Sequence, residues 1–175
     1  KDYYNNDKVK TQGVLSRRDA LRILKTCGVL VEQTTNRKAF QSRVQSREYF
    51  KGCVLVETSS FRIAPFRWLE TLSRSDFFLC LSGAGFPMCH NAIEAMAVGT
   101  IPVIEYADWF GTPLEHDKNA VVFSGAESLG EKVLKILEMP EEKIRVMRKN
   151  VADYYDRHLS AKSFIRRFEA MPEGP

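Results

Sequence analysis

The sequence lacks several features that would identify its class at once. No apolar run approaches the ~18 residues needed to span a bilayer, and no charged leader followed by an apolar segment opens the chain. There is no Cys-x-x-Cys pair, no histidine at metal-ligand spacing from a cysteine, and no Asp-x-Asp motif, since Asp108 and Asp117 are isolated. His116 and His158 have no carboxylate at the spacing of a catalytic triad. We therefore expect no membrane span and no metal.

Cysteines are few and lie in apolar surroundings, at Cys27, Cys53, Cys80 and Cys89. This pattern favours buried free thiols and a reducing compartment such as the cytoplasm. A disulfide between Cys53 and Cys80 remains an alternative, because these residues could lie on neighbouring strands. The chain begins at Lys1 rather than Met, so we expect that a targeting signal or a whole domain precedes it. If that segment carries a membrane anchor, the Golgi lumen is the alternative location.

The composition is that of one globular domain. The 175 residues are 44% hydrophobic and 27% charged, with a formal net charge of +4. Lysine and arginine are scattered, so the positive charge fits ordinary solvated faces as well as an anionic ligand. No basic stripe is interleaved with aromatic residues, which disfavours nucleic-acid binding.

Strand and helix patterns alternate along most of the chain. Residues 1–13 form a polar lead-in, 14–170 the domain and 171–175 a polar tail. Short β-branched or apolar runs predict buried strands at residues 29–31, 53–57, 77–81, 101–104 and 120–123. The alternation predicts an α/β fold with a doubly wound, mostly parallel, Rossmann-like sheet.

Helix starts are marked by capping residues and prolines. Ser16 with Asp19, and Ser124 with Glu127, have the spacing of capping boxes. One further helix is predicted over residues 39–50, and two others begin at Pro65 and Pro140. The helix from Pro65 is expected to bury the side that carries Phe66, Leu69 and Leu72. A last, amphipathic helix after Ser160 contains Phe164, Ile165 and Phe168.

The segment from Ser82 to Ile104 combines a strand end, a glycine-rich turn, a helix and the next strand. In α/β sheets this unit often binds an anionic ligand, because backbone N–H groups and the helix dipole converge on it. The turn consists of Ser82, Gly83, Ala84 and Gly85. The same residues also fit a plain bend between strand and helix.

The helix that follows this turn is predicted to have two different sides. A buried stripe is formed by Cys89, Ala92, Ile93, Met96 and Ala97. His90 and Glu94 are one turn apart on another edge, with Asn91 beside them. His90 could donate to a diphosphate, and Glu94 could accept hydrogen bonds from ribose hydroxyls, although each could also be an ordinary structural or solvated side chain.

The run AGFPMCHNAIEAMAVGTIPVI resembles the donor-binding segment of GT-B glycosyltransferases, closest to the exostosin-like group. The matching residues are Glu94, Ala95, Gly99, Pro102, Val103 and Ile104, and the later run IRVMRKNVADYYDRHL is also similar to that group. The similarity covers roughly residues 12–168 and is strongest over residues 77–123. It implies the second half of a GT-B enzyme, which binds a nucleoside-diphosphate sugar, UDP favoured, and transfers the sugar to a glycan or other acceptor without a metal.

The resemblance also implies roles for single residues. Glu94 would contact the ribose, Arg17 and Arg18 would reach the diphosphate, and Arg62, which follows Phe61, would lie near the base. His90 or Asn91 stands where the group has an arginine. Phe86 and Pro87 occupy the region of the first glutamate of the pair found in related retaining enzymes.

Such an enzyme needs an N-terminal domain that supplies the acceptor site and catalytic base, and we expect this domain to be missing here. The alternatives are a non-catalytic α/β nucleotide-binding or interaction module, and another GT-B-shaped enzyme such as a sugar-nucleotide epimerase.

Overall fold

The computed structural model describes residues 13–34, 36–45, 52–56, 58–83 and 88–170. Residues 1–12 of the predicted lead-in, the predicted tail, and Ala84, Gly85, Phe86 and Pro87 lie outside the described residues. The described helices are α2 Arg17–Thr26, α3 Arg37–Gln45, α4 Pro65–Ser73, α5 His90–Ala97, α6 Gly125–Leu137, α7 Glu141–His158 and α8 Ala161–Glu169. The described strands are β1 Leu30–Thr34, β2 Cys53–Val56, β3 Phe77–Cys80, β4 Ile101–Ile104 and β5 Val121–Val122.

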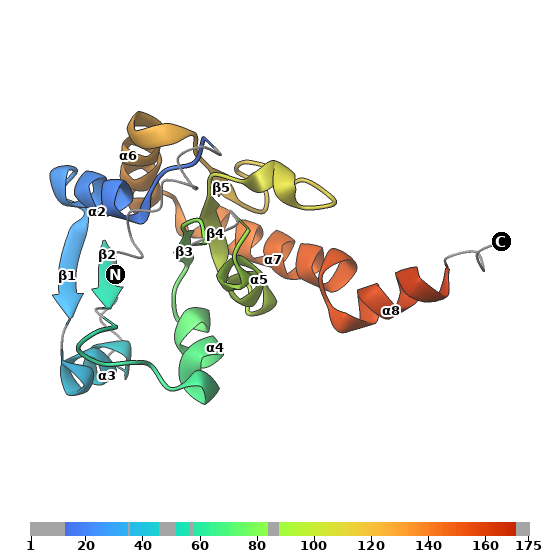
Figure 1. Ribbon diagram of the computed structural model, residues 1–175, viewed down its shortest axis with the longest axis horizontal. Helices are drawn as coiled ribbons and strands as arrows, with labels where there is room; N and C mark the ends of the chain where they lie inside the picture. The colour runs from blue at the N-terminus through green and yellow to red at the C-terminus, as the bar shows by residue number, and fades with distance from the viewer. Residues whose placement is uncertain (1–12, 35, 46–51, 57, 84–87, 171–175) are drawn as a thin grey trace.

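All strand pairs are parallel, as predicted for an α/β fold, but the described strands form two sheets rather than one. β1 pairs with β2, and a three-stranded sheet has the order β3-β4-β5. In Figure 1, α2 and α6 lie on one side of the three-stranded sheet, and α5 and α7 lie on the other. The fold is thus mixed α/β with helices on both sides of a small parallel sheet.

The hydrophobic core is built around β4, which is buried along its whole length. Its neighbours are fully or almost fully buried residues of α5, β5, α6 and α7, namely Ala92, Met96, Val121, Leu129, Met147, Val151 and Tyr154. The core thus holds the three-stranded sheet against its helices. By contrast, β2 is only half-buried, so the prediction of a strand covered on both faces is wrong for residues 53–56.

Two of the three predicted serine caps are confirmed. The Ser16 hydroxyl accepts from the Asp19 backbone N–H at 3.1 Å and donates to the Asp19 carboxylate at 2.6 Å. Ser160 accepts from the Ser163 backbone N–H at 3.1 Å. The cap predicted at Ser124 is wrong, because this side chain makes no capping hydrogen bond.

Helix α4 turns a different face inward from the one predicted. Leu72 is buried, but Phe66 is 84% exposed and Leu69 is 45% exposed. The aromatic residue that packs inward is Trp68, whose ring meets the edge of Phe78 at a centroid distance of 5.8 Å. Proline fixes where this helix begins but not its rotation, and the large indole determines which side is buried.

Residues from later in the chain complete the end of α4. The buried Thr100 hydroxyl donates to the Leu72 carbonyl at 2.7 Å. The Arg148 guanidinium donates to the carbonyls of Ser73 and Ser75 at 3.0 and 2.7 Å. These bonds add side-chain donors to carbonyl groups at and just after the helix end, where the Leu72 carbonyl also accepts from the Ser75 backbone N–H at 2.9 Å.

The four cysteines are free thiols. Cys53 and Cys80 lie in different sheets, so the bridge left open by the sequence is not formed. Burial raises the pKa of both thiols above the ordinary value, most strongly at Cys80, which is only 1% exposed. Burial therefore disfavours the thiolate form of both residues.

Candidate functional site

The candidate site lies at the carboxyl edge of the three-stranded sheet. Ser82 follows β3, and Glu105 follows β4. Because these strands are parallel, both residues reach the same edge, where open α/β sheets bind their ligands. The first residues of α2, α5 and α6 lie close to this edge, so several backbone N–H groups lie near it.

Arg17, the first residue of α2, reaches the predicted turn. Its Nε donates to the carbonyl oxygen of Ser82 at 3.2 Å, and Ser82 is 5% exposed. This contact joins two predicted site residues that are 65 positions apart in the sequence. Arg18, the next residue, is exposed.

The N-cap side chain of α5 does not close the start of this helix. Cys89 is the N-cap residue and makes no capping hydrogen bond, and the first turn contains no acidic residue. His90 is exposed and Asn91 is half-buried at this end. The first-turn N–H groups and the positive end of the helix dipole therefore remain a favourable place for an anion.

Glu94 has a specific partner that the sequence did not indicate. One carboxylate oxygen accepts from the indole Nε1 of Trp68 at 2.7 Å, and both side chains are half-buried. This bond fixes the direction of the carboxylate, and no hydrogen bond joins its second oxygen to another described residue. A freely solvated carboxylate, the alternative that the sequence left open, does not describe Glu94.

The buried side of α5 is rotated relative to the prediction. Ala92 and Met96 are fully buried, as predicted, but Ala97 is exposed. Ala95, which the prediction left out, is fully buried instead. The reason is that α5 is covered on two sides, by the sheet and by α7, so a single stripe underestimates its buried surface.

Glu105 connects two helix starts, and sequence reasoning did not assign it a role. One carboxylate oxygen accepts from the Gly125 backbone N–H at 2.7 Å, at the first position of α6. The other accepts from the Leu15 backbone N–H at 2.5 Å, just before α2. The acidic residue directly after a buried strand was the available signal. Glu105 replaces the cap predicted at Ser124, so α6 carries its own anion.

Tyr106 is a second residue that sequence reasoning missed. It is 2% exposed, and its hydroxyl makes no hydrogen bond of normal geometry with the described residues. Burial, and then the thiols of Cys80 and Cys89, raise the pKa of this hydroxyl, while the Cys89 backbone N–H and Arg17 partly offset the rise. Tyr106 therefore lies beneath the start of α5 as a neutral polar group.

The predicted base-binding residues lie on the loop between β2 and α4. Phe61 is 8% exposed, and its ring lies 5.8 Å from that of Phe40. Arg62 is exposed. Among the described residues, no hydrogen bond or ion pair joins Arg62 to Arg17, Ser82 or Glu94. The structure therefore joins Arg17 to Ser82 by a hydrogen bond and shows no such bond from Arg62 among the described residues.

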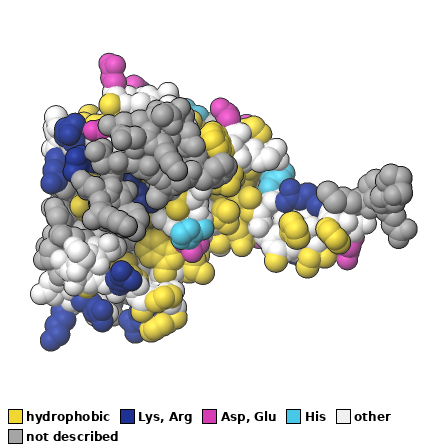
Figure 2. Space-filling view, viewed as in Figure 1, with side chains coloured by type: hydrophobic (Ala, Val, Ile, Leu, Met, Phe, Trp, Pro, Cys, Tyr) yellow, Lys and Arg dark blue, Asp and Glu magenta, His cyan; other side chains and the backbone are white. Residues whose placement is uncertain are grey.

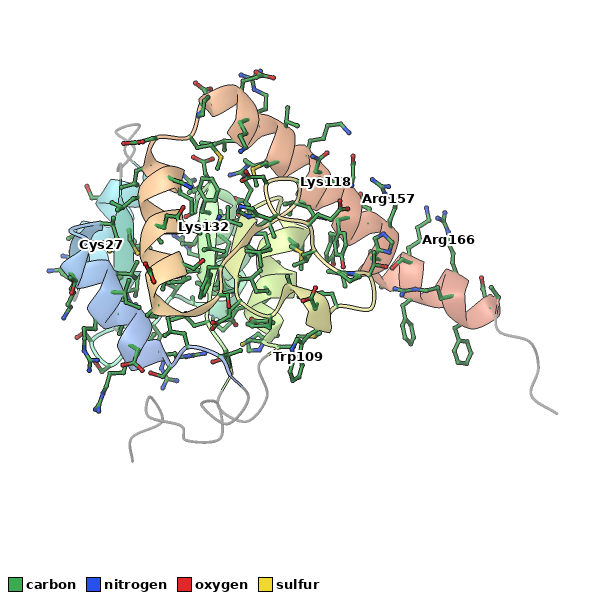
Figure 3. The ribbon with its side chains drawn as sticks, turned by 90° about the horizontal axis from the view of Figure 1, so that it is seen from above. Cys27, Trp109, Lys118, Lys132, Arg157 and Arg166 are labelled. Carbon is green, nitrogen blue, oxygen red and sulfur yellow. The ribbon has the colours of Figure 1, made fainter. Side chains whose placement is uncertain are left out.

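His116 is engaged in local structure. Its Nδ1 accepts from the Val122 backbone N–H at 3.1 Å, and its Nε2 lies 3.0 Å from the Lys132 amine of α6 (Figure 3). Burial, opposed by Asp117 and assisted by Lys132, lowers the pKa of this imidazole. His158 contacts the Thr112 hydroxyl at 3.3 Å. Both histidines thus lie in contacts that hold loops against helices.

Two general features complete the description of the site. In the described part of the chain, no group of three or more His, Cys, Asp or Glu side chains is arranged to hold a metal ion. No helix of that part is long and apolar enough to cross a membrane. Comparisons with models of known protein families, with curated proteins and with solved structures find no match to this chain.

Proposed function

We propose that this chain is the donor-binding domain of a GT-B type glycosyltransferase, similar to the exostosin-like group, and that it binds a nucleoside-diphosphate sugar. UDP is the favoured nucleotide. The domain works as one half of a longer enzyme whose other domain supplies the acceptor site and the catalytic base. The Rossmann-like GT-B architecture belongs to this proposal.

The observation that carries the proposal is the contact between Arg17 and Ser82 beside the open start of α5. A diphosphate at this edge would meet the Arg17 guanidinium and the first-turn N–H groups of α5 together. Glu94 lies one turn further along the same helix, and its free oxygen suits a ribose hydroxyl. The three groups thus follow the order of charge and hydroxyl groups in a nucleoside diphosphate.

These groups also suit the reaction. When the sugar leaves, negative charge grows on the diphosphate, and fixed donors that face it stabilise the transition state more than the ground state. Arg17 is already held in place by its bond to Ser82, so little reorganisation is needed. The role of the domain is therefore to bind the donor and to stabilise the leaving group.

Isothermal titration calorimetry with UDP, GDP, ADP and CMP, each with and without Mg²⁺, tests the proposal. UDP should bind, and Glu94→Ala should weaken it by about 1–3 kcal/mol through loss of charged hydrogen bonds to the ribose. Arg17→Gln should weaken UDP but not uridine, because only UDP has the diphosphate.

Arg22→Gln is the matched control, since Arg22 belongs to the same helix and its side chain is 70% exposed. This variant should bind UDP like the parent chain. If no nucleoside diphosphate binds, the donor site is disproved and a non-catalytic module becomes the better description. Unchanged UDP affinity in Glu94→Ala would disprove the ribose contact alone.

A further inference from the structure

Helix α8 exposes large apolar side chains to solvent. Phe164 is 66% exposed, Ile165 is 53% exposed and Phe168 is 69% exposed. Figure 1 shows α8 projecting from the body of the molecule after the turn that ends α7. Isolated exposed apolar residues are normal, but three on one nine-residue helix form a patch that requires an explanation.

The three side chains share one face of the helix. At 3.6 residues per turn, Phe164, Ile165 and Phe168 cluster together, while Ser163 lies on the opposite side. Ser163 is 6% exposed and is the buried residue of α8. The helix is amphipathic, as the sequence predicts, but its polar side faces the protein and its apolar side faces away from it.

Cations flank this apolar face. On the helical wheel Lys162 lies on one flank and Arg167 on the other, while Arg166 lies on the polar side with Ser163. Among the described residues, no carboxylate lies within ion-pairing distance of Lys162 or Arg166. Both side chains are exposed. Their positive charge is thus available to an external partner.

The same cations open onto a groove between α8 and the end of α7. Its volume is about 570 Å³, and it is lined by Asp156, Arg157, Ser160, Lys162, Ser163, Arg166, Arg167 and Ala170. Figure 3 shows Arg157 and Arg166 on the same side of the corner between the two helices. Four cations and one carboxylate line this groove, so it favours anionic groups.

A second copy of the chain is a poor partner for this helix. Two α8 helices placed face to face would bring their flanking cations together, and like charges repel at such distances. An anionic lipid surface satisfies both parts of the helix at once. Its acyl chains accept the apolar side chains, and its phosphates face the cations on both flanks.

We propose that α8 binds the surface of anionic lipid bilayers. The helix lies in the plane of the interface, with Phe164, Ile165 and Phe168 at the boundary between headgroups and acyl chains. Lys162 and Arg167, on the two flanks of this face, lie at the level of the lipid phosphates. Figure 2 shows the hydrophobic side chains gathered on α8 beside Lys and Arg.

Vesicle co-sedimentation with the full 175-residue chain tests this proposal. The chain should bind phosphatidylcholine vesicles that contain about 30% phosphatidylserine, and it should bind pure phosphatidylcholine far less. Phe164→Ala with Phe168→Ala should weaken binding at least about tenfold. Lys162→Gln should weaken it about fivefold, and added salt should abolish this difference.

Two variants elsewhere in the chain serve as matched controls. Leu134→Ala removes an apolar side chain that is 47% exposed on α6, and Arg145→Gln removes a cation near the start of α7. Both should bind vesicles like the parent chain. Phe168→Trp gives an independent readout, because its fluorescence should shift to the blue when vesicles are added.

The following outcomes would overturn the proposal. The first is no binding to either kind of vesicle. The second is equal weakening by the control variants, which would assign binding to general charge or apolarity. The third is a concentration-dependent dimer, measured by light scattering, that Phe164→Ala with Phe168→Ala abolishes, because a second copy would then be the occupant.

Discussion

Trp68 and Glu94, which are 26 positions apart in the sequence, are joined by a hydrogen bond of 2.7 Å between the indole nitrogen and a carboxylate oxygen. This bond connects α4 to α5 directly. It also gives the single acidic residue of α5 a fixed direction at the candidate site. The bond can be tested for its contribution to stability without any ligand.

We expect Trp68→Phe to lower the free energy of unfolding by about 1–2 kcal/mol, because the half-buried carboxylate loses its donor. Glu94→Gln should cost less, since the amide oxygen can still accept from the indole. Urea denaturation of both variants measures these changes. Phe66→Ala on the exposed side of the same helix should change stability by less than about 0.5 kcal/mol. An equal loss in Phe66→Ala would contradict this interpretation.

Glu105 should be more important for stability than its exposure suggests. Its two oxygens accept from two backbone N–H groups, and one of these opens α6. Glu105→Ala should therefore lower the free energy of unfolding by about 2–4 kcal/mol. Glu105→Gln should cost roughly half as much, because an amide has one acceptor oxygen.

Ser124→Ala is the control for this prediction, since Ser124 makes no capping bond, and it should change stability by less than about 0.5 kcal/mol. Ser16→Ala removes a real cap and should cost about 1 kcal/mol. The assignment fails if Ser124→Ala and Glu105→Ala prove equally destabilising in chemical denaturation.

Gly130 marks a close contact between α6 and α2. A Cβ added there would lie 3.2 Å from the Cys27 sulfur, and the residue is buried. Alanine favours a helix interior by about 1 kcal/mol over glycine, but the crowded sulfur opposes this gain. The change in the free energy of unfolding caused by Gly130→Ala should therefore be more favourable, by at least about 1 kcal/mol, in a chain that also carries Cys27→Ala. A double-mutant cycle from thermal unfolding measures this coupling, and additive effects would show that the sulfur moves aside freely.

The free energy of unfolding should decrease on the acid side because of His116. Its pKa is lowered in the folded chain relative to the ordinary value of 6.5, so the unfolded chain binds the proton more readily. This contribution to stability is complete above about pH 6.5 and is lost as the pH falls through the folded pKa. His116→Asn should flatten the decrease, as measured by urea denaturation between about pH 7 and 5.

Lys132→Gln should also reduce this dependence, because the Lys132 charge assists in lowering the imidazole pKa. Lys149→Gln provides a charge-matched control, since Lys149 pairs with Asp153 rather than with His116. The same slope in parent and His116→Asn chains would exclude His116 as the titrating group.

Local signals in the sequence predicted the elements well. Ser16, Pro65 and Ser160 mark the starts of their helices because a cap or a proline acts within one turn. The parallel strands followed from alternation of strand and helix. The division into two sheets could not be predicted, because it depends on which strands pair and not on any one strand.

The candidate site was predicted less completely. Arg17, Ser82 and Glu94 were expected to meet a ligand, but their own contacts depend on how distant elements approach each other. Nothing near Glu94 in the sequence indicates Trp68, because the partner comes from another helix. The same holds for α4, where one apolar pattern fits two rotations and the indole decides between them. The glycine turn at Ala84 and Gly85 stays a prediction.

The end of α4 is completed in an order that synthesis imposes. Leu72 receives a side-chain donor from Thr100, which is 28 residues later, and Ser73 receives one from Arg148, which is 75 residues later. A ribosome adds about 5–20 residues per second, so the second bond becomes possible several seconds after α4 is made. During vectorial synthesis the end of α4 therefore acquires its last side-chain donor only after α7 has been made.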